Sequence, residues 1–405
     1  MPPDRLATAD LLVVAHEYNR FVKAQVDVLA DHVGSVHVFV RYNRFADIAA
    51  SLSVEAAEPY SGAVKVDRSD VPANVTVHET PLCYLPLDVH RERLLGRQHA
   101  RKVSGIVADL DVEFDLVHAH MTWTAGYVGA RLKRDLGVPY LLTVHANPEW
   151  YEDLLTADHD RIETAWEAAD RLIRVNREDR TRLDPYNDDV VYVPNGYDSA
   201  AFRRVPRDAA RERLGVDPET SLVFGLGTLI PRKGYDHLVR ALPKLVEAVP
   251  DVQVVVGGHG GMREDLESLA ADLGVADHVT FLGYVEEEAL NDWMNAADVF
   301  AHPSRSESFG VVQLEAMACR TPVVAARNGG SEEVVADEEY GVLVDDPSDH
   351  DRFADTLATA LAADWDRAAI AAYADRFTWE TVCEDIADLY RDVLDETERQ
   401  VTSAP

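Results

Sequence analysis

The sequence predicts an α/β protein built from two doubly wound, Rossmann-like domains, each with a parallel sheet. Three observations support this prediction. The chain has 405 residues, which is more than one ordinary domain holds. Short apolar runs rich in β-branched residues alternate with longer helical patterns, as expected for parallel sheets that are covered on both faces. The alternation pauses over residues 199–220 and then starts again.

The apolar runs form two series, and the weakly patterned stretch 199–220 lies between them as a linker. We therefore expect one domain over residues 1–199 and a second over residues 200–375. The expected strands of the first domain are 10–16, 35–42, 114–120, 139–145, 171–175 and 190–194, and those of the second are 222–228, 252–258, 279–283, 299–304 and 321–326.

The chain is strongly acidic, with a net charge of −33. Six of its 39 basic residues are lysine and 33 are arginine. A surface of this charge repels nucleic acid, so we expect no nucleic-acid partner. Acid excess with arginine in place of lysine resembles the proteins of salt-accumulating halophilic archaea, in which the acidity is an adaptation to solvent.

The sequence also indicates a compartment. No stretch approaches the roughly 20 apolar residues of a membrane helix, and the apolar run 11–15 is too short for a secretory signal. The three cysteines, Cys83, Cys319 and Cys383, are odd in number and lack metal-ligand spacing. We therefore predict reduced cysteines and a cytoplasmic protein.

The strongest candidate for a functional segment is 302–326, which reads strand, loop, helix, turn and strand. Ligands of doubly wound sheets bind at the carboxyl ends of the strands, and with two such sheets we expect the site in the cleft between the domains. Glu307 lies in the loop, and Glu315 follows eight positions later among apolar helix neighbours. Carboxylates suit sugars because each accepts two hydroxyl hydrogen bonds. Solvated surface glutamates are the alternative.

A second candidate segment is 224–242, in which a strand ends at Gly227 and Arg232 and Lys233 precede a helix. Cations beside a helix start can neutralise a diphosphate, whereas the alternative is an ordinary basic loop. Glycine clusters at 257–261 and 328–331 follow two other strands of this series. Tight turns are the default explanation for such clusters.

Histidines end strands in the first domain. His145 closes an apolar strand, and both a structural and a catalytic role stay open for it. His118 and His120 alternate on one strand and therefore share a face. They lack a third ligand, so we expect no zinc or other metal site.

Together these segments resemble the retaining glycosyltransferases of family 4, whose GT-B fold places two Rossmann-like domains across a cleft. The resemblance covers nearly the whole chain and is most specific where Glu307 and Glu315 match the family's E-x7-E motif. It implies a hexosyltransferase-type enzyme without a metal or other cofactor, with a nucleotide-diphosphate sugar as donor substrate. It also implies that residues 376–405 form a helix that crosses back to the first domain. Other matching segments are FDLVHAH (114–120), VVYVPNGYD (190–198), PRKG (231–234) and VVVGGHG (254–260).

The resemblance implies a role for each matching position. Glu315 would bind the ribose hydroxyls of the donor, Glu307 would face the transferred sugar, and Lys233 would bind the diphosphate. The remaining carried-over positions are the amides of Ser308, Phe309 and Gly310 for sugar hydroxyls, the backbone of Tyr284 and Val285 for the base, and His145 near the reacting sugar.

Two positions depart from the family's pattern. Thr228 follows Gly227 where the family commonly has an arginine on the diphosphate, so either Arg232 substitutes or phosphate binding is weaker. The amino-terminal loop, often glycine-rich in the family, contains His16 and Asn19, which we take as acceptor-side residues.

One local feature opposes the global charge. Residues 90–102 contain five basic residues and one acidic residue, and Arg93, Arg97 and Arg101 would share one face of a helix. We expect this face to bind a phosphate-bearing glycan or lipid-linked acceptor, with peripheral association of the enzyme with an anionic membrane. Pairing with the chain's own carboxylates is the other explanation.

The expected function is transfer of a sugar to a glycan or lipid-linked acceptor, in the assembly of a cell-surface glycan, glycolipid or glycoprotein. Two alternatives stay open. The enzyme would make a soluble sugar or a glucan, or it would be an epimerase with the GT-B fold. The basic face at 90–102 favours the glycan or lipid-linked acceptor over a soluble sugar or glucan product.

Overall fold

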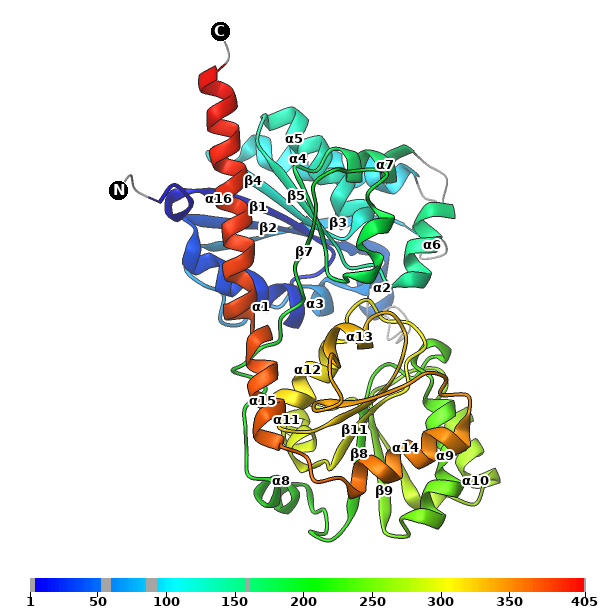
Figure 1. Ribbon diagram of the computed structural model, residues 1–405. Helices are drawn as coiled ribbons and strands as arrows, with labels where there is room; N and C mark the ends of the chain where they lie inside the picture. The colour runs from blue at the N-terminus through cyan, green and yellow to red at the C-terminus, as the bar shows by residue number, and fades with distance from the viewer. Residues whose placement is uncertain (1–3, 52–59, 85–92, 157–159, 404–405) are drawn as a thin grey trace. The chain divides into compact units, whose positions relative to one another are not determined.

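The computed structural model describes residues 4–51, 60–84, 93–156 and 160–403. The chain divides into two compact units, Met1–Pro194 with Trp379–Pro405 and Asn195–Thr378 (Figure 1). The boundaries expected from the sequence, after residues 199 and 375, lie a few residues from these positions. Within the described ranges, no helix is both long and apolar enough to cross a bilayer.

The first unit contains a seven-stranded parallel sheet in the order β3-β2-β1-β4-β5-β6-β7. The strands are β1 (Asp10–Ala15), β2 (Ser35–Asn43), β3 (Val75–Leu82), β4 (Leu116–His120), β5 (Tyr140–Val144), β6 (Arg171–Arg174) and β7 (Val190–Tyr192). The helices are α1 (Arg20–Leu29), α2 (Arg44–Ser51), α3 (Gly62–Lys65), α4 (Arg93–Asp109), α5 (Tyr127–Leu136), α6 (Pro148–Thr156), α7 (Asp160–Glu167) and α16 (Trp379–Ser403).

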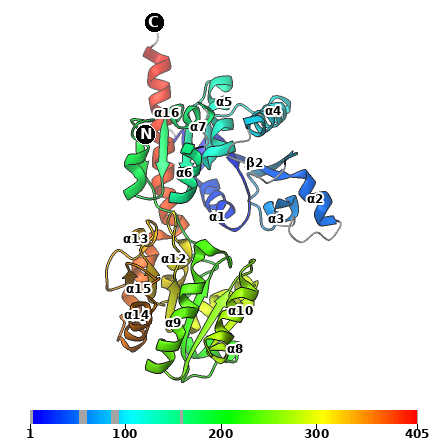
Figure 2. The ribbon, with the colours of Figure 1, turned by 90° about the vertical axis from the view of Figure 1, so that its right-hand side faces the viewer.

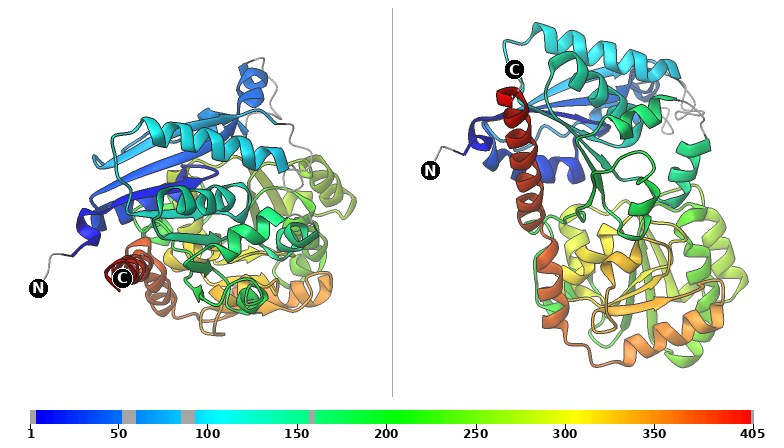
Figure 3. Two further views of the ribbon diagram at one scale, coloured as in Figure 1. Left: turned by 90° about the horizontal axis from the view of Figure 1, so that it is seen from above. Right: turned by 45° about the horizontal axis from the view of Figure 1, so that its top comes forward.

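Helices cover both faces of this sheet, which explains why its central strands are continuously apolar. Along β1, Leu11 and Val13 pack in a core with residues of α1 and α16. The alternate residues Leu12 and Val14 pack in a second core with residues of α4, α5 and α7. The C-terminal helix α16 is thus an integral part of the first unit, and its course along that unit can be followed in Figure 3.

The second unit contains a six-stranded parallel sheet in the order β10-β9-β8-β11-β12-β13. Helices α9, α10 and α14 supply one of its cores, and Figure 2 shows α9 and α10 side by side. The strands are β8 (Ser221–Leu226), β9 (Val252–Gly257), β10 (Val279–Gly283), β11 (Val299–His302), β12 (Val323–Ala326) and β13 (Gly341–Val344). The helices are α8 (Arg207–Leu214), α9 (Tyr235–Ala248), α10 (Arg263–Asp272), α11 (Glu287–Ala296), α12 (Val311–Ala318), α13 (Ser331–Val334), α14 (His350–Ala362) and α15 (Arg367–Ala374).

The predicted fold class is confirmed, and all eleven expected strands are present. Two strands, β3 and β13, are absent from the prediction, and each lies at an edge of its sheet. Edge strands are only partly covered and therefore carry a weaker apolar signal, as in VTVHETPL of β3. The expected linker 199–220 is wrong in part, because it contains helix α8, which belongs to the second unit.

Candidate active site

The candidate site of the second unit is built where the strand order reverses. Strand β8 is flanked by β9, its successor in the chain, on one side and by β11 on the other. In open α/β sheets, such a switch point leaves a crevice beyond the carboxyl ends of the two central strands. The segment after β8 contains Arg232 and Lys233, and the segment after β11 contains Glu307. The fold therefore brings together two segments that lie about 70 residues apart in sequence.

Close backbone packing joins these two segments. Gly234 has a left-handed φ of +67°, and a Cβ at this position would lie 2.2 Å from the carbonyl oxygen of Pro303. A residue with a side chain would thus separate the loops. The amide of Arg305 donates a hydrogen bond of 2.8 Å to the carbonyl of Arg232. The PRKG motif is therefore explained by contact with the loop that carries the first glutamate of the E-x7-E motif.

Three basic side chains surround one oxygen of Glu307. Lys233 Nζ lies 2.5 Å from Glu307 Oε1, His302 Nε2 lies 3.3 Å from it, and Arg232 Nη1 lies 3.6 Å from it. The Glu307 side chain is 12% exposed and that of Lys233 is 16% exposed. Arg232 also donates a hydrogen bond to the carbonyl of Ser306. The cluster is thus a partly buried carboxylate held by cations.

The neighbours of Glu307 decide its protonation state. Burial alone would raise the pKa of the carboxyl, but the hydrogen bond and charge of His302 and the charge of Lys233 together hold that pKa well below its usual range. Burial lowers the pKa of His302, against the opposing effect of Glu307. Glu307 is therefore an anion at neutral pH, and its carboxylate can only accept hydrogen bonds.

A third loop holds the Glu307 loop in place. Asn328, after β12, donates from its side-chain amide to the carbonyl of Ser304 and accepts from the amides of Gly330 and Ser331. The amide of Glu307 in turn donates to the carbonyl of Asn328 at 3.4 Å. A Cβ at Gly330 would lie 2.8 Å from the Glu307 Cβ. The cluster 328–331, which a tight turn could explain, thus packs directly against the loop with Glu307.

Residues 308–310 lead from Glu307 into α12. Gly310 adopts a left-handed φ of +90° immediately before the helix. Among the described residues, the amides of Phe309 and Gly310 have no hydrogen-bond acceptor, whereas Ser308 has a partner. Glu315 lies inside α12 and is 6% exposed. Free amides at a helix start suit anionic or hydroxyl oxygens. The local structure therefore suits the binding of sugar hydroxyls expected here, and that role stays a prediction.

The remaining donor-side positions lie at the carboxyl edge of the same sheet. A Cβ at Gly258 would lie 1.9 Å from the carbonyl oxygen of Gly227, so the glycine cluster allows the segments after β8 and β9 to approach. Thr228 is exposed. Tyr284 is 71% exposed, and Val285 lies beside Gly257. An exposed aromatic ring after β10 suits a nucleotide base, and base binding at this position stays a prediction.

The sequence marks His302 only as a polar residue at the end of a strand, and it does not single out Tyr235. Tyr235 is 2% exposed, and its hydroxyl has no hydrogen-bond partner among the described residues. Burial, with the nearby charge of Glu307, raises the pKa of this phenol. The signal for Tyr235 in the sequence is its place directly after Gly234.

In the first unit, His145 is the end of a chain of histidines. His120 Nδ1 lies 3.2 Å from His145 Nε2, and the two rings are stacked. The rings of His118 and His120 are 4.4 Å apart, which agrees with the shared face predicted for them. His118 contacts the Tyr390 hydroxyl of α16 at 2.6 Å and the Thr143 hydroxyl at 2.8 Å. The position of His145 is thus set by a buried polar network.

The other acceptor-side candidates lie at the first strand's end and on α4. His16 Nε2 accepts a hydrogen bond of 3.2 Å from the amide of Thr124, and Asn19 precedes α1 and donates to the carbonyl of Val64.

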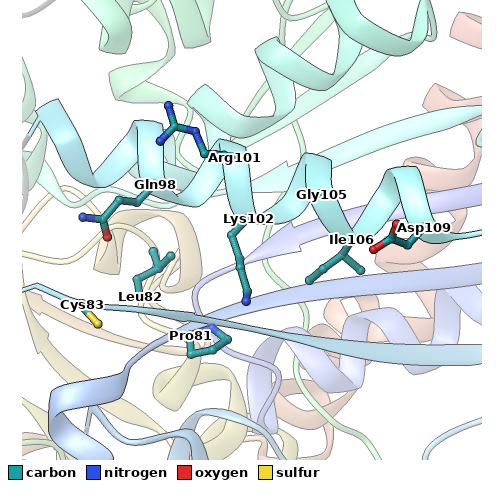
Figure 4. A pocket seen from close by; sticks show the side chains of 9 residues that line it. All are labelled: Pro81, Leu82, Cys83, Gln98, Arg101, Lys102, Gly105, Ile106 and Asp109. Carbon is teal, nitrogen blue, oxygen red and sulfur yellow. The ribbon is translucent and has the colours of Figure 1, made fainter.

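Helix α4 begins at Arg93, whose side chain lies outside the described residues, and Arg97 and Arg101 are both exposed. Arg101 and Lys102 line a surface cavity of about 630 Å³ together with Cys83 (Figure 4). Among the described residues, neither Arg97 nor Arg101 lies within 4 Å of a carboxylate. Pairing with the described carboxylates therefore does not account for these two arginines. Among all the residues that the structure describes, no group of three His, Cys, Asp or Glu side chains is arranged to hold a metal.

Comparisons with known proteins identify the family. Residues 18–201 match the family described as Glycosyltransferase Family 4, and residues 206–377 match Glycosyl transferases group 1. A D-inositol 3-phosphate glycosyltransferase of Acidothermus cellulolyticus is 38% identical over 71% of this chain and 69% of its own length. One from Rhodococcus opacus is 34% identical over 83% and 75% of the respective chains.

Solved structures share the fold. A sucrose-phosphate synthase from Thermosynechococcus elongatus has a TM-score of 0.75 at 22% identity, with 96% of this chain and all of that chain covered. Anabaena Alr3699/HepE in complex with UDP-glucose has a TM-score of 0.66 at 23% identity, with 95% and 99% covered. The chain therefore belongs to the GT-B glycosyltransferases that join a Family 4 domain to a group 1 domain, and it is an enzyme that transfers sugars.

Proposed function

We propose that this enzyme transfers a sugar, with retention of configuration, from a nucleotide-diphosphate sugar to a small, soluble, phosphorylated acceptor. The acceptor is inferred from the relatives above, which are named D-inositol 3-phosphate glycosyltransferases. The donor is inferred from a structural neighbour that holds UDP-glucose. These similarities favour the soluble-product alternative over the surface-glycan function expected from the sequence, and nothing in them supports a lipid-linked acceptor or a membrane partner.

The observation that carries this proposal is the ionised Glu307 beside two cations at the switch point of the second sheet. Lys233 and Arg232 approach the same carboxylate oxygen, at 2.5 and 3.6 Å. An ammonium group has three hydrogens to donate. Lys233 can therefore keep its bond to Glu307 while it binds a diphosphate oxygen, and Arg232 would take the place of the arginine that Thr228 replaces.

These residues would act on the departing diphosphate without a metal. Fixed cations and the free amides before α12 would stabilise negative charge as it develops on the leaving group. Glu307 would accept hydrogen bonds from hydroxyls of the transferred sugar, which orients the sugar but forms no covalent bond. The leaving phosphate would receive the acceptor's proton on the same face of the sugar, and His145 would contact a hydroxyl of the reacting sugar.

The acidic surface supports a second, independent inference about the setting. A net charge of −33 with 33 arginines and six lysines fits a protein that works at high salt, where the Debye length falls to about 3 Å at 1 M and self-repulsion is screened. We therefore propose a salt-rich cytoplasm as the place of reaction. Assays belong at molar salt.

Product analysis tests the proposed function. The protein is incubated with UDP- and GDP-sugars and, in separate reactions, with inositol phosphate, inositol or a polyprenyl phosphate, in molar KCl with EDTA. The expected result is a product of retained anomeric configuration, formed with inositol phosphate alone. Glu307→Gln should abolish transfer, whereas the exposed control Glu338→Gln should not. An inverted product, an absolute need for metal, transfer to the polyprenyl phosphate or epimerisation of the donor would overturn the proposal.

A further inference from the structure

Arg41 is a buried cation that has no counter-ion among the residues that the structure describes. It lies near the end of β2 and is 9% exposed. Its Nε and Nη1 atoms are buried and have no hydrogen-bond partner among the described residues. Its other contacts are the ring of Tyr84, whose centroid is 5.6 Å away, and His16 Nδ1, which lies 3.4 Å from Arg41 Nη2. In the described part of the chain, no carboxylate lies within 4 Å of this guanidinium.

The groups around Arg41 are basic or neutral. His99 of α4 is fully buried, and its Nε2 atom has no partner among the described residues. Burial, followed by the charge of Arg41, lowers the pKa of His99 well below its usual range. Thr124 links the two histidines, because its hydroxyl lies 2.8 Å from His99 Nδ1 and its amide donates to His16 Nε2. A buried charge with no compensating partner is costly to a folded protein. A negatively charged ligand would remove this cost.

The contact between Arg41 and His16 does not compensate the buried charge. A neutral imidazole has one N–H donor and one acceptor nitrogen. His16 Nε2 accepts from the Thr124 amide, so Nδ1 carries the proton. That N–H and the Arg41 Nη2 group are then two donors 3.4 Å apart, which cannot bond to each other. An acceptor oxygen placed beside Arg41 would satisfy its buried Nε and Nη1 donors, and the planar guanidinium favours a carboxylate or phosphate.

The cluster lies at the switch point of the first sheet. Strand β1 is flanked by β2 on one side and by β4 on the other. Ala15 pairs with Val40 and Val14 pairs with Ala119, so His16, Arg41 and the turn after β4 reach the same carboxyl edge. This is the position at which open α/β sheets bind ligands. The unpaired cation therefore lies where a ligand is expected on independent grounds.

We propose that Arg41 binds the phosphate group of the acceptor. The ligand class is a phosphate monoester of a small polyol or sugar. This inference rests on the proposed function for the identity of the ligand, whereas the anion site itself rests on the burial and pairing of Arg41. The site would explain how an acidic chain selects a phosphorylated acceptor over the corresponding free polyol.

Thermal unfolding in phosphate tests the site. The unfolding temperature is measured in inorganic phosphate and in sodium chloride of equal ionic strength, and again with inositol phosphate and with inositol. The wild type should be stabilised by phosphate and by inositol phosphate but not by inositol. Arg41→Met should lose this stabilisation, and Arg41→Lys should bind phosphate about tenfold more weakly because it lacks the bidentate fork. The exposed Arg44→Met, with the same change in charge, should retain it.

Two further measurements separate the possible results. Lys233→Met should keep the phosphate effect, which excludes binding at the proposed diphosphate site. If the effect survives in Arg41→Met, or is absent from the wild type, the anion site is overturned. Transfer to inositol phosphate with an unchanged KM in Arg41→Met would reject the site and leave the proposed function standing. Phosphate binding that depends on Arg41, without transfer to any phosphorylated acceptor, would support the anion site and reject the proposed function.

Discussion

The buried histidine His120 makes a quantitative prediction about acid stability. Its side chain is 1% exposed, and burial lowers its pKa from 6.5 to about 4. Its Nδ1 faces His145 Nε2 at 3.2 Å, while its own Nε2 has no partner among the described residues. A buried donor without an acceptor costs more than a buried acceptor without a donor. The proton is therefore on Nδ1, and His120 donates to His145.

The sign and size of the effect follow from the two pKa values. As the pH falls below 6.5, the unfolded chain takes up a proton at this position before the folded chain does. The free energy of unfolding should therefore decrease from about pH 7.5 downward and level off below about pH 4. The difference of about 2.5 pKa units corresponds to roughly 3 kcal/mol.

His120→Asn is the matched variant, because the asparagine amide replaces the Nδ1–H donor and does not titrate. Denaturant unfolding of both proteins at constant salt from pH 7.5 to pH 4 isolates the contribution of His120. The wild type should lose roughly 3 kcal/mol more than the variant over this range. Parallel curves for the two proteins would refute the assignment of His120 as a buried, neutral histidine.

Three other predictions concern the second unit. In a double-mutant cycle, Lys233→Met and Glu307→Gln should show a coupling of roughly 1–3 kcal/mol in the free energy of unfolding, and additive effects would contradict the buried ion pair. Gly258→Ala should lower stability by about 1–3 kcal/mol, as measured by thermal unfolding, because its φ is +127° and its Cβ would lie 1.9 Å from the Gly227 oxygen. Asn328→Ala removes three hydrogen bonds worth about 1 kcal/mol each. The Asn328→Ala variant should reduce kcat for transfer more than it raises KM. An unchanged kcat would show that the loop with Glu307 keeps its position without the Asn328 side chain.

The fold could be predicted from the sequence because parallel strands covered on both faces leave a direct apolar signal. The runs that become β1, β4 and β5 are almost wholly buried. The signal failed at β3 and β13, two of the four edge strands, and in the supposed linker. There, α8 presents only a few buried positions and reads as polar sequence.

The candidate site could be predicted only in part. Glu307 and Lys233 stand in motifs with a characteristic spacing, but their contact depends on β8 and β11 being neighbours, which no local pattern reveals. Arg41 could not be found at all. It is one of 33 arginines, and what distinguishes it is the absence of a carboxylate nearby among the described residues, which is a property of the folded surroundings and not of the residue.

The two switch points use buried cations in opposite ways. Lys233 is already neutralised by Glu307, so the proposed donor site would be balanced before a nucleotide sugar binds, and an incoming diphosphate would add negative charge that Arg232 would share. Arg41 has no such partner among the described residues, so its charge there would stay uncompensated until an anion binds. A ligand stabilises a protein in proportion to its preference for the folded state. An acceptor phosphate at Arg41 would therefore stabilise the first unit more than its few contacts suggest, because it also relieves a cost that the empty site bears.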